Sequence, residues 1–134
     1  MQMQQGTVMD VVAAAVVADG RLLVVSKQAA PDVFYLPGGK PEPGERPEET
    51  LARELDEELG VVPGGVERLA VVEDVAALEG VPMRMVVFAA TLSGEPSPAA
   101  ELAAMRWTDG RGDVRLAPAV GGQVVPLLRK LGRL

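Results

Sequence analysis

The sequence predicts a single α+β domain that spans residues 1–134. Valine-rich stretches bounded by turn residues indicate strands near the start and through the second half of the chain. Between them, residues 47–59 repeat leucine every four positions, which is typical of an amphipathic helix. No stretch rich in Pro, Gly or Ser is long enough to separate two domains, and no apolar run reaches the length of a membrane span.

A β-hairpin is predicted to open the domain. Residues 7–18 are rich in Val and Ala, and residues 21–26 resume this character after Asp19-Gly20, a dipeptide typical of two-residue hairpin turns. Residues 30–44 then contain seven prolines and glycines, too many for a regular element apart from a short extended piece at 34–36. We therefore expect a long, shaped loop, and such loops are often functional.

One helix follows this loop. Pro47 suits a first helical position, and Gly60 lies where a left-handed residue would end the helix. Leu51, Leu55 and Leu59 give the helix an apolar stripe that faces a core.

The second half of the chain predicts three strands and a closing helix. The strands are expected at residues 66–75, 81–92 and 102–108. The last helical segment covers residues 120–131, in which Pro126 marks a kink or a late start.

The composition excludes several kinds of chemistry. The chain has no Cys, which excludes disulfides and thiol nucleophiles, and no His, which excludes a Ser-His-Asp triad and imidazole ligands to zinc. Its net charge of −6 argues against nucleic-acid polymers and anionic membranes as partners. Residues 1–6 lack the basic start of a secretory signal, so a cytoplasmic location is expected.

The negative charge is local. Residues 42–58 contain eight acidic and two basic residues and carry the whole net charge of −6, while the other 117 residues hold equal numbers of each sign. On a helix that turns by about 100° per residue, Glu54, Glu57 and Glu58 share one edge beside the leucine stripe. Asp56 falls on the far side and is expected to be an ordinary solvated charge.

This acidic edge is either a solvated face, the usual meaning of such a run, or a functional site. Like charges three and four positions apart repel, and no Lys or Arg at i+4 is expected to compensate them. Glu57 and Glu58 also lie in the last turn, where the helix dipole favours cations. Both penalties favour a bound divalent cation, and oxygen ligands without His or Cys select Mg²⁺, Mn²⁺ or Ca²⁺. Because Mg²⁺ takes further ligands from phosphate oxygens, we expect a phosphate ester or anhydride as substrate.

The same residues carry a specific resemblance. Gly39, Glu45 and the run Arg53-Glu54-Leu55-Asp56-Glu57-Glu58-Leu59-Gly60-Val61 match every fixed position of the Nudix box, here residues 39–61. The lead-in Leu36-Pro37-Gly38-Gly39-Lys40 is also similar to that of the Nudix hydrolases. The chain thus resembles a minimal, MutT-like Nudix protein. The resemblance implies an α/β/α sandwich around a mixed sheet and cleavage of a nucleoside diphosphate linked to another moiety.

The resemblance also implies roles for individual residues. Glu54, Glu57 and Glu58 are the expected Mg²⁺ ligands, with Mn²⁺ as an alternative ion and the Gly39 carbonyl as a further candidate ligand. Arg53 would orient Glu54 through a salt bridge. Glu45 would support the loop or reach the metal ion through a water molecule, and Gly38 would support the loop. The general base is either Glu54 or Glu101, and a surface acid is an equally good interpretation of Glu101.

Four residues are weaker candidates for substrate contacts. Lys27 and Lys40 could bind phosphates, although lone basic residues are more often solvated. Phe34 and Tyr35 could stack on a base or sugar, although core packing is the default for aromatic residues.

The predicted function is Mg²⁺-dependent hydrolysis of a small-molecule nucleotide by attack of water on phosphorus. The chain lacks the residues outside the box that the resemblance associates with ADP-ribose, dinucleoside polyphosphates or oxidised purines, so a nucleoside or deoxynucleoside triphosphate is the preferred substrate. Hydrolysis of ADP-ribose or another nucleotide sugar remains an alternative. So does a non-catalytic nucleotide-binding or regulatory module of the same fold. Similar proteins are often dimers, and the valine-rich strands could supply either a homodimer interface or a core.

Overall fold

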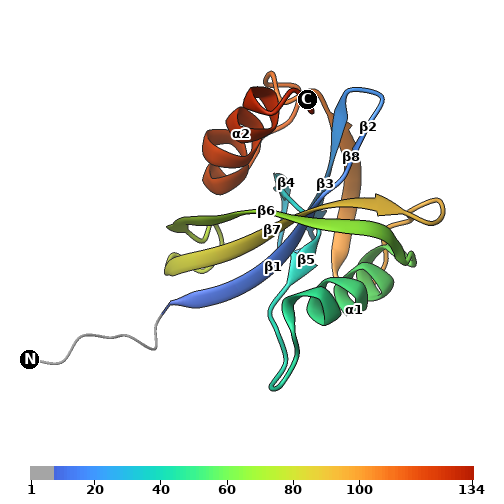
Figure 1. Cartoon of the computed structure of the whole chain (residues 1–134). Coiled ribbons are helices and arrows are strands. Elements are labelled where there is room, and N and C mark those ends of the chain that lie inside the picture. Colours follow the sequence, from blue (N-terminus) through green and yellow to red (C-terminus); the bar gives the residue numbers. More distant parts are fainter. Residues whose placement is uncertain (1–7) are drawn as a thin grey trace, which may run out of the picture.

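Two β-sheets lie between two helices in the computed structural model, which describes residues 8–134 (Figure 1). One sheet is mixed, with the strand order β5-β1-β7-β6. Its strands β1 and β7 run parallel and its other pairs are antiparallel. The bounds of these strands are β1 Met9–Ala15, β5 Gly38–Gly39, β6 Pro63–Val75 and β7 Pro82–Leu92.

The second sheet is built around β3 and is antiparallel. Strands β2 and β4 pair with β3 along one path, and β8 also pairs with β3. The bounds of these strands are β2 Val17–Ala18, β3 Arg21–Lys27, β4 Ala30–Tyr35 and β8 Leu102–Thr108.

Each helix covers its own hydrophobic core. Helix α1 (Pro47–Leu59) packs its leucine stripe, at most 1% exposed, against residues such as Leu23 and Phe88. On the other side, a π-helical turn, η2 (Val120–Val124), continues into α2 (Val125–Lys130). Leu128 of α2 packs in a core that contains Leu22. Adjacent residues of β3 therefore contribute to opposite cores, because successive side chains of a strand point to opposite faces. The predicted α+β sandwich is confirmed, with its strands divided between two sheets.

The ends of α1 agree with the sequence prediction. Pro47 is its first residue, and Gly60 follows it in the left-handed conformation with φ 67°. At the N-terminus the backbone N–H of Arg46 donates to Glu49 Oε1 at 2.8 Å, which is one half of a capping box, because the Arg46 guanidinium has no acceptor for the other half. The last turn contains no basic residue.

The predicted hairpin is only partly present. Asp19-Gly20 joins β2 to β3, so the turn is confirmed, but the pairing covers only Val17 with Leu22 and Ala18 with Arg21. Strand β1 leaves this hairpin and pairs with β5 and β7 in the other sheet. The loop at residues 30–44 is also more regular than expected, because it contains β4 and β5.

The closing helix is divided as Pro126 suggested. Proline lacks the backbone N–H that an interior helical position uses, so it fits the start of a helix. The α-helical part begins at Val125, and the five residues before it form the π-helical turn. Within residues 8–134, no helix is both long enough and apolar enough to cross a lipid bilayer. The cytoplasmic location stays a prediction.

Candidate active site

The Gly38-Gly39 strand fixes one end of the site. Strand β5 pairs with β1, with Val12 opposite Gly39, and this pairing holds the loop against α1. The backbone N–H of Gly38 donates to Glu58 Oε1 at 3.1 Å. Gly38 has φ 151°, and a Cβ there would lie 2.1 Å from the carbonyl oxygen of Val12. A side chain at this position would push the loop away from β1, so the close approach requires glycine.

Gly39 lies equally close to a carboxylate. A Cβ at Gly39 would lie 2.4 Å from both Cδ and Oε2 of Glu54. The missing side chain therefore leaves the space that the Glu54 carboxylate occupies. This packing joins the loop and the helix at the first acidic position of the predicted edge.

Burial raises the pKa of the carboxyl groups of Glu54 and Glu58. Glu58 is only 4% exposed, and desolvation raises its pKa to about 7, against the lowering effect of the Gly38 hydrogen bond. The neighbouring charges of Glu54 and Glu101 raise this pKa further, while Lys27 lowers it. Desolvation also raises the pKa of Glu54, against the opposing hydrogen bond from Arg53. Buried carboxylates of this kind are stabilised in their charged form by a nearby cation.

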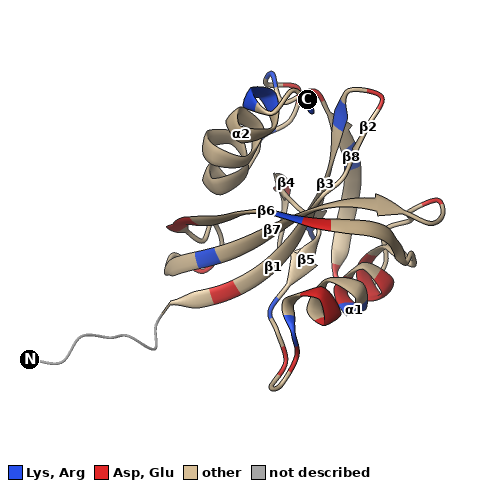
Figure 2. Cartoon of the chain, viewed as in Figure 1, with Lys and Arg blue, Asp and Glu red and all other residues tan. Residues whose placement is uncertain are grey.

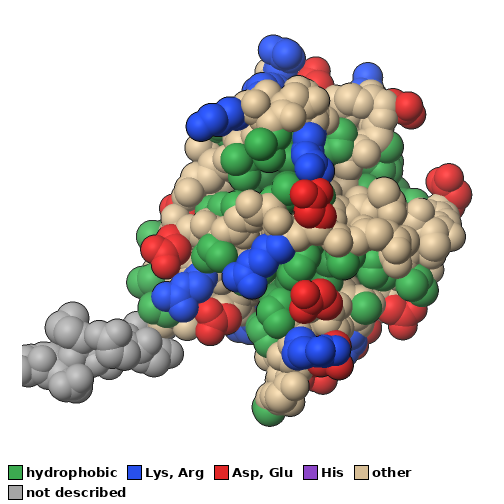
Figure 3. Space-filling model, viewed as in Figure 1, with side chains coloured by type: hydrophobic (Ala, Val, Ile, Leu, Met, Phe, Trp, Pro, Cys, Tyr) green, Lys and Arg blue, Asp and Glu red, His purple; other side chains and the backbone are tan. Residues whose placement is uncertain are grey.

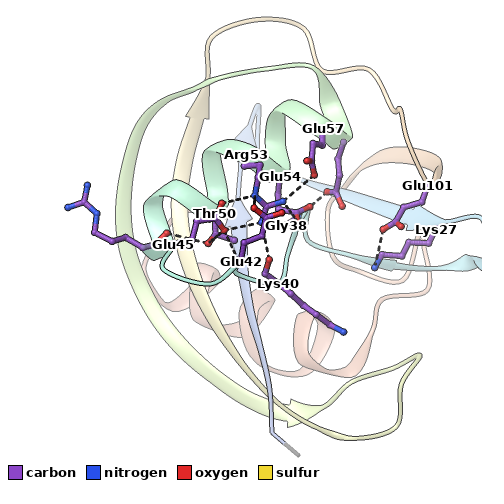
Figure 4. Close-up of polar contacts among 12 residues, drawn as sticks. Lys27, Gly38, Lys40, Glu42, Glu45, Thr50, Arg53, Glu54, Glu57 and Glu101 are labelled. Carbon is purple, nitrogen blue, oxygen red and sulfur yellow. Dashed lines mark hydrogen bonds and ion pairs between the residues drawn. The ribbon is translucent and has the colours of Figure 1, made fainter. Parts of the chain in front are cut away.

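Arg53 lies at the centre of the acidic group (Figure 4). Its Nη1 lies 3.1 Å from Glu54 Oε2 and 3.2 Å from Glu57 Oε1. Its Nη2 donates to the carbonyl oxygen of Lys40 at 3.0 Å, which ties the loop to α1. The sequence expectation that no basic residue compensates this face is wrong, because Arg53 and Glu57 are an i,i+4 pair.

Glu45 fixes the other side of the guanidinium. Arg53 Nε donates to Glu45 Oε2 at 2.6 Å, and Arg53 Nη2 donates to Glu45 Oε1 at 3.0 Å. The Thr50 hydroxyl donates to Glu45 Oε1 at 2.8 Å. The bonds from Arg53 above all, and then the bond from the backbone N–H of Glu42, lower the pKa of Glu45 to about 2. Glu45 is therefore fixed by a bidentate contact with Arg53, and its supporting role stays a prediction.

The loop before β8 brings Glu101 to the same region. Its backbone N–H groups bond to carbonyls at the end of α1, with Ala99 N donating to Glu58 O at 2.8 Å. Gln28 N donates to Glu101 O at 2.9 Å, and the Glu101 carboxylate lies 3.6 Å from Lys27 Nζ. Figure 4 shows this ion pair beside the Arg53 cluster.

A cavity of about 570 Å³ joins these groups. Its charged end includes Lys27, Arg53, Glu54, Glu58 and Glu101, together with the Gly38-Gly39 strand. Most of its other lining residues are apolar and come from β1, β7, the β6–β7 turn and the segment before η2, and Glu79 of that turn also lines it. A volume of this size suits a small organic ligand.

Two predicted residues lie apart from the deepest part of the site. Phe34 is 8% exposed and packs in the core beneath α2, and it is not among the residues that line the cavity. The side chain of Glu57 is 52% exposed and is also outside the cavity wall. Tyr35 and Lys40, in contrast, both line the cavity. Asp56 is exposed, as its place on the far side of the helix predicted.

Sequence reasoning missed Thr50 and Glu42. Thr50 is fully buried and bonds to Glu45, while Glu42 Oε1 lies 3.6 Å from Arg53 Nε. The sequence signal for Thr50 was its place at the edge of the leucine stripe, five positions after Glu45 and three before Arg53. Acidic residues concentrate on α1 and the loop before it, as Figure 2 shows.

The donor set fits a hard divalent cation. It consists of the carboxylates of Glu54, Glu57 and Glu58 and the backbone carbonyl of Gly39, which has no side chain to obstruct it. The Glu58 side chain is buried and that of Glu54 is partly buried. Within residues 8–134, no three acidic side chains lie close enough as they stand to hold a metal ion together. Arg53 holds Glu54 and Glu57, and Gly38 holds Glu58, so these contacts would have to rearrange for all three carboxylates to share one ion.

Comparison with known proteins identifies close structural relatives. The family model of the NUDIX domain matches residues 8–110. The crystal structure of MutT NUDIX hydrolase from Burkholderia pseudomallei is 31% identical, with a TM-score of 0.71, and the match covers 89% of this chain and 95% of that chain. The solution structure of the E. coli ORF135 protein is 27% identical, with a TM-score of 0.70 and coverages of 97% and 94%.

A third structure, that of a UDP-X diphosphatase, is 28% identical with a TM-score of 0.78, and the match covers 96% of this chain and 65% of that chain. No curated protein sequence matches the chain.

Proposed function

The chain belongs to the Nudix hydrolases, and we propose that it cleaves a phosphoric anhydride bond of a nucleoside or deoxynucleoside triphosphate. We propose Mg²⁺ as its metal ion, with Mn²⁺ as an alternative. Nudix hydrolases generally use divalent metal ions and act on small-molecule nucleotides. The identity of the substrate and of the ion are the parts that we propose for this chain.

One observation carries the proposal. One cavity has carboxylates in its wall, among them the buried Glu58, together with a larger set of apolar side chains. A nucleotide has the same division, because its phosphates require cations and its base has two apolar faces. The cavity therefore supports a ligand that carries both parts.

Four groups would hold the metal ion: the carboxylates of Glu54, Glu57 and Glu58, and the carbonyl of Gly39. When bound, such an ion offsets phosphate charge and lowers the pKa of a water molecule. Glu58 is positioned by the Gly38 N–H, and Glu54 is positioned by Arg53 and by the space above Gly39. These contacts support the two carboxylates beside the cavity in the absence of substrate, and they would be exchanged in part for the metal ion when it binds.

Two carboxylates are candidates for accepting the proton of the attacking water. Glu54 and Glu101 both line the charged end of the cavity. Glu54 lies 3.1 Å from Arg53 Nη1, whereas Glu101 lies 3.6 Å from Lys27 Nζ on a more exposed loop. Lys27 is also placed to contact a substrate phosphate, since it lines the same end of the cavity.

A nucleotide sugar is the second candidate substrate. The name UDP-X diphosphatase describes an enzyme that cleaves a nucleoside diphosphate linked to another group, and that structure resembles this chain with a TM-score of 0.78. The same charged end would serve this reaction, and the group beyond the phosphates would differ.

The test is a product assay over a panel of nucleoside triphosphates, deoxynucleoside triphosphates and nucleotide sugars with Mg²⁺ or Mn²⁺. Identification of pyrophosphate, orthophosphate or a monophosphate pair among the products fixes the bond that is cleaved. We expect Glu58→Gln to lower kcat/KM by about 100-fold or more, because even residues that only support metal ligands reach this effect. Asp56→Asn is the matched control on the exposed side of the same helix and should retain full activity.

Full activity of Glu58→Gln, or wild-type activity undiminished in EDTA, would contradict the proposed metal-dependent reaction. If the protein turned over nucleotide sugars and no triphosphate, a nucleotide sugar would be assigned as its substrate in place of a triphosphate.

A further inference from the structure

Two segments far apart in the sequence line the apolar part of the cavity. Residues 75–78, at the end of β6 and in the β6–β7 turn, form one of them. Ala117, Ala119 and Val120, before and at the start of η2, form the other. Contact energy falls steeply when a gap of about 0.5–1 Å opens between packed atoms. The spacing of these two segments therefore affects how tightly an organic group is bound between them.

The side chain of Gln123 joins the two segments. Gln123 belongs to η2 and lies three residues after Val120. Its amide nitrogen Nε2 donates to the carbonyl oxygen of Glu73 at 2.8 Å and to Asp74 Oδ2 at 3.0 Å, at the end of β6 (Figure 1). Each hydrogen of the amide thus has its own acceptor, and a carboxylate acceptor makes the stronger bond of the two.

Few other polar contacts hold β6 on this side. Strand β6 is at the edge of its sheet, so one side of its backbone has no strand partner. Among the residues that the structure describes, no backbone hydrogen bond links β6 to η2. Arg133 Nη2 also donates to Glu67 Oε1 at 3.0 Å, but neither of these residues lines the cavity. At the cavity, the contact of β6 with η2 therefore depends on Gln123.

Asp74 connects this contact to the β6–β7 turn. Its Oδ1 accepts a hydrogen bond from the backbone N–H of Val75 at 2.7 Å, while its Oδ2 accepts from Gln123. The turn is closed beyond Val75, because Ala76 N donates to the carbonyl oxygen of Val81 at 2.9 Å. A shift of Asp74 would therefore move the lining side chains of the turn with it.

The π-helical turn lets one short segment make both contacts. The backbone N–H of Val125 donates to the carbonyl oxygen of Val120, five residues earlier, so the turn holds one residue more than an α-helical turn. Val120 lines the cavity and Val124 is fully buried, whereas Gln123 is partly exposed and reaches β6. Insertions of this kind occur frequently at functional sites.

We propose that Gln123 is a positioning residue, which holds the β6–β7 turn against η2 and thereby sets the width of the apolar part of the cavity. This inference rests on the proposed function, because it requires a substrate whose organic group enters that part. Gln123 itself does not line the cavity. It therefore acts on the binding of the organic group and leaves the attack of water on phosphorus, at the charged end, unchanged.

Gln123→Glu tests this assignment, because it keeps the size of the side chain and removes both N–H donors. The new carboxylate would meet the Glu73 carbonyl and the Asp74 carboxylate, and both repel it. We expect KM for the best nucleoside triphosphate to rise about 10-fold, while kcat changes by less than about 2-fold. For ribose 5-triphosphate, which has the phosphates and the sugar but no base, kcat/KM should be unchanged. Gln123→Ala, which removes the contact without repulsion, should raise KM in the same direction by a smaller factor.

Arg133→Gln is the matched control, because it breaks the contact of β6 with Glu67 away from the cavity. Its KM and kcat should equal those of the wild type, and urea midpoints of all variants report whether they fold. An equal loss for ribose 5-triphosphate in the Gln123 variants would overturn the assignment. So would a fall in kcat alone, or an unchanged KM for every nucleotide.

Hydrogen exchange followed by mass spectrometry separates this inference from the proposed reaction. Without substrate, the amides of residues 75–81 should exchange faster in Gln123→Glu than in the wild type or in Arg133→Gln. Faster exchange in a protein that turns over no nucleotide would refute the proposed reaction and retain Gln123 as the residue that holds the turn. Turnover of nucleotides with unchanged exchange and KM in Gln123→Glu would refute the role of Gln123 and retain the reaction.

Discussion

Gly39 lies so close to the Glu54 carboxylate that position 39 has no room for a side chain. This contact constrains the active site, although the two residues are far apart in the sequence. A Cβ at Gly39 would lie 2.4 Å from Glu54 Oε2, at the free end of a flexible side chain. The neighbouring Gly38 meets the fixed backbone of Val12 instead. Two adjacent glycines therefore have different functions: Gly38 permits strand pairing, and Gly39 permits the position of a carboxylate.

Gly39→Ala should reduce activity more than stability. The new methyl group displaces the Glu54 carboxylate rather than the backbone, and misplacement by about 1 Å can cost about 100-fold in rate. We expect kcat/KM to fall by about 10- to 100-fold while the free energy of unfolding changes by less than about 1 kcal/mol.

Gly94→Ala is the control for this prediction, because a Cβ at Gly94 meets no atom within 4 Å. Steady-state kinetics and urea unfolding of both variants provide the check. Unchanged activity of Gly39→Ala would show that the position of Glu54 does not limit the reaction.

At the scale of residues, helical periodicity and the box were enough to predict that Glu54, Glu58, Arg53 and Glu45 belong to one site, and the structure brings them close together, while their roles stay predictions. It did not separate Phe34 from Tyr35. Adjacent strand residues point to opposite sides, and which side faces a cavity depends on the other sheet. The structure places Phe34 in the core and Tyr35 at the cavity.

The loop at residues 40–45 and helix α1 behave as one element because Arg53 joins them. Its guanidinium contacts the Lys40 carbonyl and both oxygens of Glu45. The hydrogen bonds from Arg53 lower the pKa of Glu45 to about 2 in the folded protein, against an ordinary value of 4.5. Between these values the unfolded chain binds more protons at this position than the folded chain does. The stabilisation from Glu45 is therefore complete above pH 4.5 and is lost as the pH falls toward 2.

Glu45→Gln should be less stable than the wild type at neutral pH, and this difference should shrink as the pH is lowered from about 5 to about 3. Urea midpoints at several pH values in this range provide the measurement. Glu95→Gln serves as the control, since Glu95 is exposed in the loop before β8. A difference between wild type and Glu45→Gln that stays constant with pH would contradict the link to Arg53.

Secondary-structure elements with local signals were predicted well. Pro47 and Gly60 mark the ends of α1, and the strand bounds at residues 102–108 agree with β8. The first strand was misassigned to a simple hairpin, because Asp19-Gly20 specifies a turn and not which strand pairs beyond it. Strand β1 finds its partners at β5 and β7, and this choice depends on residues far along the chain.

The two cores should unfold together, because both sheets contribute to both cores. Leu55 in the core beneath α1 is fully buried, and Leu128 in the core beneath α2 is 1% exposed. We expect Leu55→Ala and Leu128→Ala each to lower the free energy of unfolding by about 2–5 kcal/mol. Leu131→Ala should have little effect, since Leu131 is 48% exposed.

Urea unfolding followed by far-UV circular dichroism and by fluorescence of Trp107, the single tryptophan, tests this prediction. The two signals should coincide in each variant. Separate transitions for the two probes in either variant would show that the cores unfold independently.

A homodimer interface on the outer surface of the mixed sheet stays a prediction. Strand β6 lies at the edge of its sheet and exposes Val66, Val71 and Val75 by 43–54%. Figure 3 shows hydrophobic side chains interspersed with charged ones on this face. The register of β6 with β7 is shifted at two places, and such irregularities discourage further strand pairing.

The parallel pairing of β1 with β7 also sets the order in which the molecule can be completed during synthesis. Met9 pairs with Met83, so β1 lacks this partner until the ribosome has made most of the chain. Strand β5 is held by β1, and β5 positions the N–H that bonds to Glu58. Helix α1 can form early from local contacts, but the long-range pairings form late. A nascent chain that ends before β7 therefore contains the acidic helix and β1, the strand that anchors the loop, but lacks the parallel partner of β1.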